Sequence, residues 1–262
     1  MYDRAVRARC ALALTVCLAL GACSREEPPP VRVSASKSPE GRALEYLRTT
    51  QDEMGVDVLV AVQIYGEARI DSRAAQVVAA QLPRMREPDV ARWRALLDGM
   101  KRPLLSAAPP PPRARVSGAL ADGDERARSC PLELLESCAV TDSCREFANA
   151  SAGGRALTRQ AEWLLFGWWR GCQLGVDVDA LRREYAGRIL EELRNDMTPS
   201  ALFFERLAVL GSLGFARSIE PAWVESLLTA QRPEGCFPAD ATHSCDPRAT
   251  GFALWALAHA PR

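Results

Sequence analysis

Histidine is scarce in this 262-residue chain and a net charge is absent, because 33 Lys and Arg residues balance 33 Asp and Glu residues. A neutral chain lacks the electrostatic field that attracts nucleic acids, so we expect no nucleic-acid partner. A Ser-His-Asp or Cys-His arrangement would have to use His243 or His259, and neither lies in a recognisable partner motif. The patterns GxGxxG, P-loop, GxSxG and HExxH do not occur. The sequence therefore identifies no reaction and implies no cofactor.

Apolar runs long enough for a stable membrane span are also absent. The run at residues 10–22 follows a basic segment and has the length of a secretion signal. It ends in Leu20-Gly21-Ala22-Cys23, which resembles a bacterial lipobox, and this resemblance implies removal of residues 1–22 and acylation of Cys23. Ordinary secretory cleavage after Ala22 is the alternative. Ser24, where an Asp would direct retention, implies outer-membrane sorting. We expect a cell-envelope protein held to the lipid bilayer through acylated Cys23.

Proline divides the remaining chain. Residues 23–40 hold three consecutive prolines and several charges, which are typical of a lipid anchor followed by an unpacked tether. A helical period begins at Gly41 and is interrupted at residues 103–125, which contain four consecutive prolines. No helix continues through such a run, since each proline lacks an amide donor and clashes with the preceding turn. We predict one domain, residues 41–262, with a proline-rich loop at 103–125.

The periodicity predicts an all-α domain of about ten helices. Its most apolar segment runs from Leu157 to Cys172, where apolar residues recur at helical spacing and tryptophans extend the apolar face to most sides. Such a helix is buried, so we predict an inner helix surrounded by the others. Asp57, Asp177 and Asp246 stand at the starts of helical periods, and we predict that they are N-caps.

Cysteine usage agrees with an exported chain. Cys10 and Cys17 leave with the signal and Cys23 is the lipidation site, so six of the nine cysteines remain in the domain. An even set in an oxidising compartment predicts three disulfides, and only the pair Cys236–Cys245 is indicated individually, because both lie in one loop. The six cysteines are Cys130, Cys138, Cys144, Cys172, Cys236 and Cys245.

The C-terminal stretch contains a recognisable turn motif. Gln231, Gly235 and Phe237 keep the spacing of the QW motif, although Ser226 replaces its upstream aromatic residue. The stretch thereby resembles a repeat of the α/α-toroid proteins, the terpene cyclase and prenyltransferase superfamily. This resemblance implies antiparallel helical hairpins that form a partial α/α toroid, in which the Gln and Gly lock a turn and carry no chemistry. The Asp-rich DxDD and DDxxD motifs of those enzymes are absent.

A second resemblance lies in the cysteine-rich stretch. It rests on the Cys138–Cys144 spacing, on Leu157-Thr158-Arg159-Gln160 and on Gly171-Cys172. These segments are similar to an uncharacterised family of secreted animal proteins, in which a histidine stands at the position of Arg159. The resemblance implies secretion and disulfides and carries no activity.

Four side chains are candidates for a cleft: Glu162 on the apolar helix, and Asp240, His243 and Asp246 in one loop. The α/α-toroid glycosidases and lyases place paired carboxylates at the ends of inner helices, so an enzyme of that kind is one alternative. Glu162 lies off the main apolar stripe, and we expect it to be exposed or paired with a cation. Zinc is a second alternative, because Cys236 and Cys245 flank Asp240 and His243. The spacing of these residues matches no structural zinc pattern, and a disulfide between the two cysteines would occupy both sulfurs.

The leading hypothesis is a non-enzymatic lipoprotein that binds an unidentified ligand or envelope protein. The enzymatic alternative requires two carboxylates roughly 5–10 Å apart in one cleft. The zinc alternative requires Cys236 or Cys245 in reduced form. His259, in the last turn of the final predicted helix, stands where a cation interacts favourably with the helix C-terminus.

Overall fold

The computed structural model describes residues 38–51, 54–99, 105–108, 111, 124–241 and 244–260. The chain divides into two units, Met1–Ala35 and Ser36–Arg262, and every described residue belongs to the second unit. The signal segment, Cys23 and most of the tether therefore lie outside the described residues. The first helix begins at Pro39, so the helical domain begins two residues before the predicted Gly41.

The domain is all-α, as predicted. Its described residues form eleven α-helices and one ladder of two short antiparallel strands. Within those residues, no helix combines the length and the apolar character that a membrane span requires. The helices are α2 (Pro39–Thr49), α3 (Val56–Arg69), α4 (Ser72–Gln81), α5 (Glu87–Gly99), α6 (Arg126–Ser137), α7 (Asp142–Asn149), α8 (Gly154–Arg170), α9 (Val178–Asn195), α10 (Ala201–Leu210), α11 (Pro221–Thr229) and α12 (Pro247–His259), and the strands are β1 (Phe237–Pro238) and β2 (Cys245–Asp246).

Two predicted aspartate caps are confirmed and one is wrong. Asp177 caps α9 and Asp246 caps α12, each by accepting a hydrogen bond from the amide three residues later. Such a bond satisfies a free helix N–H and stabilises the helix by roughly 1 kcal/mol. Helix α3 begins directly after Gly55, so Asp57 lies inside its first turn and does not cap it. The Asp57 carboxylate forms ion pairs instead.

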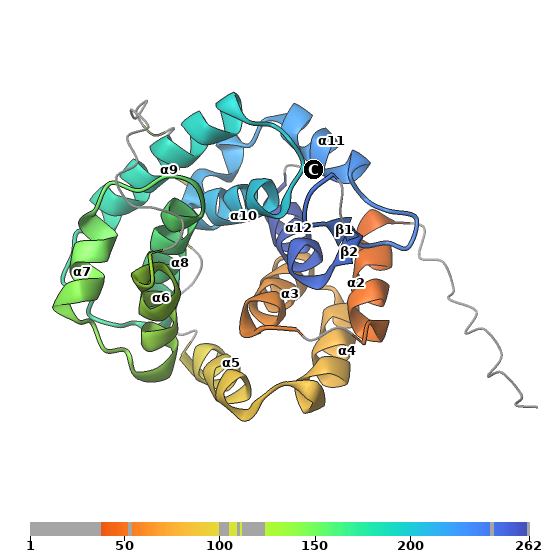
Figure 1. Cartoon of the computed structure of the whole chain (residues 1–262), viewed down its shortest axis with the longest axis horizontal. Helices are drawn as coiled ribbons and strands as arrows, with labels where there is room; N and C mark the ends of the chain where they lie inside the picture. The colour runs from red at the N-terminus through yellow and green to blue at the C-terminus, as the bar shows by residue number, and fades with distance from the viewer. Residues whose placement is uncertain are drawn as a thin grey trace, which may run out of the picture. The chain divides into compact units, whose positions relative to one another are not determined.

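Helix α8 is the inner helix that its apolar sequence predicts. Twelve of its 17 residues are buried, including the large side chains of Trp163 and Trp169. Figure 1 shows α8, α10, α12 and α3 toward the middle of the domain, with α2, α4, α7, α9 and α11 around them. Helix α12 packs against both α3 and α10, so helices from the two ends of the domain lie side by side.

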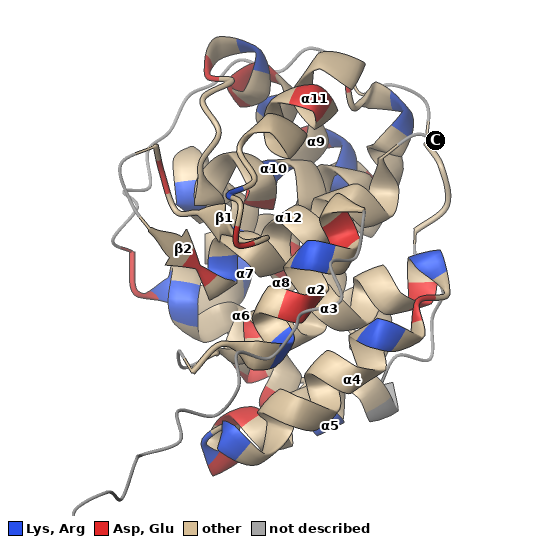
Figure 2. Ribbon diagram, turned by 90° about the vertical axis from the view of Figure 1, so that its right-hand side faces the viewer, with Lys and Arg blue, Asp and Glu red and all other residues tan. Residues whose placement is uncertain are grey.

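Charged residues are dispersed over the helices, as the sequence indicates. Figure 2 shows basic and acidic positions intermixed on the ribbon in that view. Several form pairs one helical turn apart, such as Arg48 with Glu45 and Arg182 with Asp179. Exposed pairs of this kind contribute about 0.3–0.5 kcal/mol each, so they support helices without fixing the fold.

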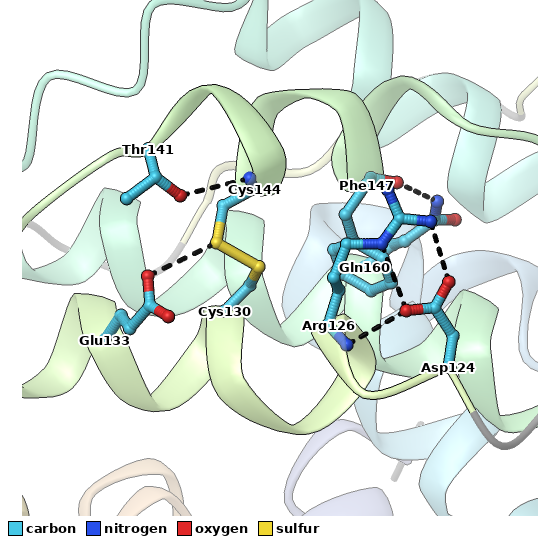
Figure 3. The surroundings of a disulfide bond; sticks show 8 residues. All are labelled: Asp124, Arg126, Cys130, Glu133, Thr141, Cys144, Phe147 and Gln160. Carbon is cyan, nitrogen blue, oxygen red and sulfur yellow. Dashed lines mark hydrogen bonds and ion pairs between the residues drawn. A yellow bond between two sulfur atoms is a disulfide. The ribbon is translucent and has the colours of Figure 1, made fainter.

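Three disulfides are present, as predicted: two connect the segment α6–α8, and the third closes the loop before α12. Their Cα atoms lie 5.4–5.5 Å apart, within the range for disulfides, and the Cys236–Cys245 pair is the one that the sequence indicates individually. Figure 3 shows one disulfide between facing turns of α6 and α7, beside Thr141, which caps α7. The link from α6 to the end of α8 closes the longest loop and stabilises the fold by about 4 kcal/mol in the chain-entropy estimate. The pairs are Cys130–Cys144, Cys138–Cys172 and Cys236–Cys245.

The QW-like turn has the structural role expected of it. Gln231 donates hydrogen bonds from Nε2 to the carbonyl oxygens of Gly235 and Pro39, both at 2.7 Å. Its Oε1 accepts from the Arg42 guanidinium at 2.5 Å. Gly235 has a φ of +93°, and a Cβ there would lie 2.5 Å from the Arg42 carbonyl oxygen. The turn therefore requires glycine, and Gln231 fixes it against α2.

Candidate functional site

A pocket of about 370 Å3 lies among α3, α5, α6 and α8, with one side chain from α12. Its volume falls within the range of small-molecule sites. The lining combines apolar residues with four arginines and two aspartates. The lining residues are Gly55, Val56, Asp57, Val60, Asp89, Arg92, Arg128, Pro131, Leu132, Leu135, Arg159, Phe166 and Arg248.

Buried and half-buried charged side chains adjoin the pocket. We call Asp57, Arg159, Glu162, Glu205 and Arg248 the acid–arginine cluster. Arg159 forms an ion pair with Glu162 and lies 4.0 Å from a Glu205 oxygen. Arg248 lies 2.9 Å from Asp57 and 3.3 Å from Glu205. Each of the two guanidinium groups thus contacts more than one carboxylate. Together these contacts join helices α3, α8, α10 and α12.

The cluster has one more carboxylate than it has guanidinium groups. The Glu162 side chain is 1% exposed, and its Oε1 atom has no hydrogen-bond partner in the described part of the chain. Burial raises the pKa of Glu162 to about 7, against the opposing charge of Arg159, and the charge of Glu205 contributes to the rise. A proton on Glu162 near neutral pH removes the excess negative charge. Glu205 is fully buried and accepts a hydrogen bond from the Thr158 hydroxyl at 2.5 Å.

The pocket's arginines differ in how their charges are compensated. Arg92 lies 2.9 Å from Asp89 and 2.5 Å from Glu136. Arg159 and Arg248 belong to the acid–arginine cluster. Arg128, in the first turn of α6, has no ion pair within the described ranges, and its side chain is exposed at the pocket. It is therefore the lining cation available to a ligand.

The structure brings one of the four sequence-predicted cleft residues to this site. Glu162 is paired with Arg159, which agrees with one of its two expected states, and it is also buried. Asp240 and Asp246 do not line the pocket, and Asp246 is used as the cap of α12. His243 lies outside the described residues. The predicted grouping of loop acids into a cleft is therefore not observed among the described residues.

The zinc alternative does not fit the described donor atoms. Ligand atoms of Glu234, Cys236 and Cys245 lie within 4.8 Å of one another. The two sulfurs are joined to each other, however, and a disulfide offers no thiolate to a metal. The short loop is held by a covalent link in place of a metal.

The expectation of a cation at His259 is wrong. Its Nε2 lies 2.8 Å from the Ser212 hydroxyl, which also accepts a hydrogen bond from the Trp255 indole at 2.8 Å. Burial, together with the charge of Arg69, lowers the pKa of His259 to about 4. The ring is therefore neutral near pH 7. The Arg69 guanidinium donates to the Leu257 and Ala260 carbonyl oxygens and provides the cation at the end of α12.

Sequence reasoning missed most of the charged site. Arg159 stands out only as the residue that replaces a histidine in the secreted animal family, and Glu205, Arg248 and Arg128 carry no local pattern. Helical spacing does place Arg159 and Glu162 one turn apart, so their pairing was foreseeable. Their contact with Glu205 and Arg248 joins residues far apart in sequence.

Comparisons with known proteins give no assignment for this site. No protein family, curated protein or solved structure matches the chain. The geometry of the pocket and of the acid–arginine cluster is therefore the basis on which function is inferred.

Proposed function

We propose that this chain is an exported, lipid-anchored binding protein whose helical domain holds a small ligand in the pocket among α3, α5, α6 and α8. The observation that carries the proposal is the pocket itself, which joins an apolar wall to charged side chains fixed by ion pairs. Small-molecule sites typically combine an apolar lining with a few oriented polar groups. The lipobox-like Leu20-Gly21-Ala22-Cys23 supports the anchor.

We further propose that the helices form a partial α/α toroid like those of the terpene cyclase and prenyltransferase superfamily. The packing of α12 against both α3 and α10 supports this arrangement, because it joins the ends of the row of helices. The Gln231 turn supports it as well. In such a fold, the ends of the inner helices surround a site, and Asp57 and Arg248 lie near the starts of α3 and α12.

The glycosidase or lyase alternative has one observation in its favour. Glu162 and Glu205 converge on Arg159, and burial gives Glu162 the raised pKa of a general acid. Neither carboxylate lines the pocket, however, and their side chains are 1% and 0% exposed. A catalytic acid must reach the glycosidic oxygen, so binding without catalysis is the better-supported function.

Filling the pocket is expected to weaken ligand binding strongly. Leu132 lines the pocket and is half-buried. Leu132→Trp therefore places a ring in the apolar space of the pocket with little effect on core packing. We expect naphthalene-2-sulfonamide to bind the full-length chain with a stoichiometry of one, and Leu132→Trp to weaken binding at least about tenfold. Isothermal titration calorimetry, with the same detergent micelles alone as the blank, measures both values.

Leu228→Trp is the matched control for this experiment. Leu228 is also half-buried, lies on α11 and does not line this pocket, so its variant is expected to bind the probe normally. Equal losses in both variants, or no saturable binding by the unaltered chain, would contradict the proposed function. Measurable hydrolysis of a polysaccharide that Glu162→Gln removes would favour the enzymatic alternative.

Membrane attachment is expected to depend on Cys23. In a bacterial host, Cys23→Ser removes the thiol that acylation requires, so the chain should shift from the membrane pellet to the soluble fraction or retain its signal. Mass spectrometry of the unaltered chain should show cleavage before Cys23 and an added acyl mass on this residue. Cleavage after Ala22 with an unmodified Cys23 would remove the lipoprotein proposal and leave the pocket proposal unaffected.

A further inference from the structure

We propose that the pocket selects ligands that carry a single negative charge on a compact apolar body, and that Arg128 binds this charge. The inference rests on the proposed function, because it names the ligand class of the same site.

The apolar part of the pocket lining defines the body of the ligand. Val60, Leu135 and Phe166 line the pocket and are almost fully buried, and the half-buried Leu132 also lines it. Contact with this apolar lining removes apolar ligand surface from water, which favours binding. A ligand without an apolar body would not cover the apolar lining of the pocket.

The compensated arginines offer no free charge. Arg92 is held by Asp89 and Glu136, so its charge is already matched. Arg159 and Arg248 face three carboxylates in the acid–arginine cluster, which is neutral only when Glu162 carries a proton. An anion bound to either of these two arginines would compete with buried acids. The described lining therefore leaves one unmatched positive charge, on Arg128.

The position of Arg128 on α6 strengthens this assignment. A cation in the first turn of a helix faces the positive end of the helix dipole, which is an unfavourable place for it. Neighbouring Arg126 is compensated by Asp124 at 2.8 Å, whereas Arg128 is not compensated within the described residues. An anionic ligand would neutralise both the guanidinium and the helix end. The amides of Ala127 and Arg128 already bond to backbone oxygens, so the guanidinium is the group that binds.

A second negative charge on the ligand would be disfavoured. Asp57 and Asp89 also line the pocket, and Glu162 and Glu205 lie beyond Arg159. Like charges brought together in a partly desolvated site repel each other strongly. The site thus matches a monoanion and discriminates against a dianion of the same shape.

Three probes with one ring system test this selectivity. Naphthalene-2-sulfonate is a monoanion, naphthalene-2,6-disulfonate is a dianion and naphthalene-2-sulfonamide is neutral near pH 7.5. For the full-length chain, we expect the monoanion to bind about tenfold more tightly than the neutral probe, the gain of one charge-assisted hydrogen bond. The dianion is expected to bind no more tightly than the neutral probe. Calorimetric titration gives the three dissociation constants.

Arg128→Gln is the informative variant. We expect it to weaken naphthalene-2-sulfonate binding about tenfold and to leave the sulfonamide unchanged. Arg183→Gln is the control, because Arg183 is exposed on α9, outside the pocket, and has no ion pair among the described residues. Equal affinities for the monoanion and the neutral probe, tighter binding of the dianion, or an unchanged monoanion affinity in Arg128→Gln would overturn this inference while leaving the binding function standing. Failure of all three probes to bind would overturn both.

Discussion

Replacing Arg159 with leucine is expected to lower the free energy of unfolding by about 3–5 kcal/mol at pH 7.5. Arg159 contacts the carboxylates of Glu162 and Glu205, which are 1% and 0% exposed, so its removal leaves buried charge without compensation. Leucine supplies the bulk of the aliphatic stem but no charge. Urea denaturation followed by circular dichroism measures the loss.

The effect of Arg159→Leu has two checks. Arg183→Leu removes an exposed α9 arginine that has no ion pair among the described residues, and we expect a change below about 0.5 kcal/mol. The double variant Arg159→Leu/Glu162→Gln removes one of the uncompensated carboxylates. The gain from Glu162→Gln should therefore be larger in the Arg159→Leu background than in the unaltered chain, by on the order of 1–3 kcal/mol. Additive effects of the two substitutions would show that these side chains are not coupled and would contradict the acid–arginine cluster.

Glu162→Gln is expected to stabilise the protein above neutral pH. Burial raises the pKa of Glu162 from 4.5 to about 7, so between these values the folded chain holds a proton that the unfolded chain has released. The stability that this group contributes therefore falls as the pH rises from about 4.5 to 7, by on the order of 3 kcal/mol. Glutamine is neutral at every pH, so the stability of the variant does not decrease in this way as the pH rises. We expect the variant to be about 1–3 kcal/mol more stable than the unaltered chain at pH 8 and equally stable near pH 4.5.

His259 opposes Glu162 over nearly the same pH range. Its pKa is lowered from 6.5 to about 4, so the unfolded chain binds the proton and stability rises with pH through this interval. The unaltered chain is therefore expected to show a partly cancelled pH dependence, and Glu162→Gln should reveal the rise that His259 causes. Denaturant titrations from pH 4 to 8 measure both curves. Glu191→Gln, at a partly exposed glutamate 3.9 Å from Arg194, is the control and should follow the unaltered chain. A stability difference that does not change with pH would contradict the raised pKa.

Local rules predicted those features that depend on neighbouring residues. The apolar residues of α8 recur at helical spacing with few polar positions, so its burial follows from its own sequence. Asp177 and Asp246 cap helices because a short acceptor precedes each helical period. Asp57 matched the same rule and was placed incorrectly, because the N-cap of α3 is Gly55, two residues earlier. Cys236 and Cys245 could be paired from their proximity in sequence, whereas the other four cysteines could not.

The candidate site contains residues that local sequence patterns do not identify. Glu162 was identified from its position on an apolar helix, but nothing near Glu205 or Arg248 marks either residue. Their meeting depends on the packing of α10 and α12 against α8 and α3. Sequence spacing reports the faces of one helix, and it does not report which helices lie beside it. The excess carboxylate, and the pKa that follows from it, exist only once these helices are assembled.

The amino-acid sequence alone determined the helical class, the burial of α8, two aspartate caps and the even cysteine set, because each depends on contacts within a few residues or on composition. The tertiary structure alone decided the cysteine pairing within α6–α8, the acid–arginine cluster and the pocket where Arg128 is uncompensated. These features join side chains that are distant in sequence, and their charges interact strongly only because the packed helices exclude water from around them.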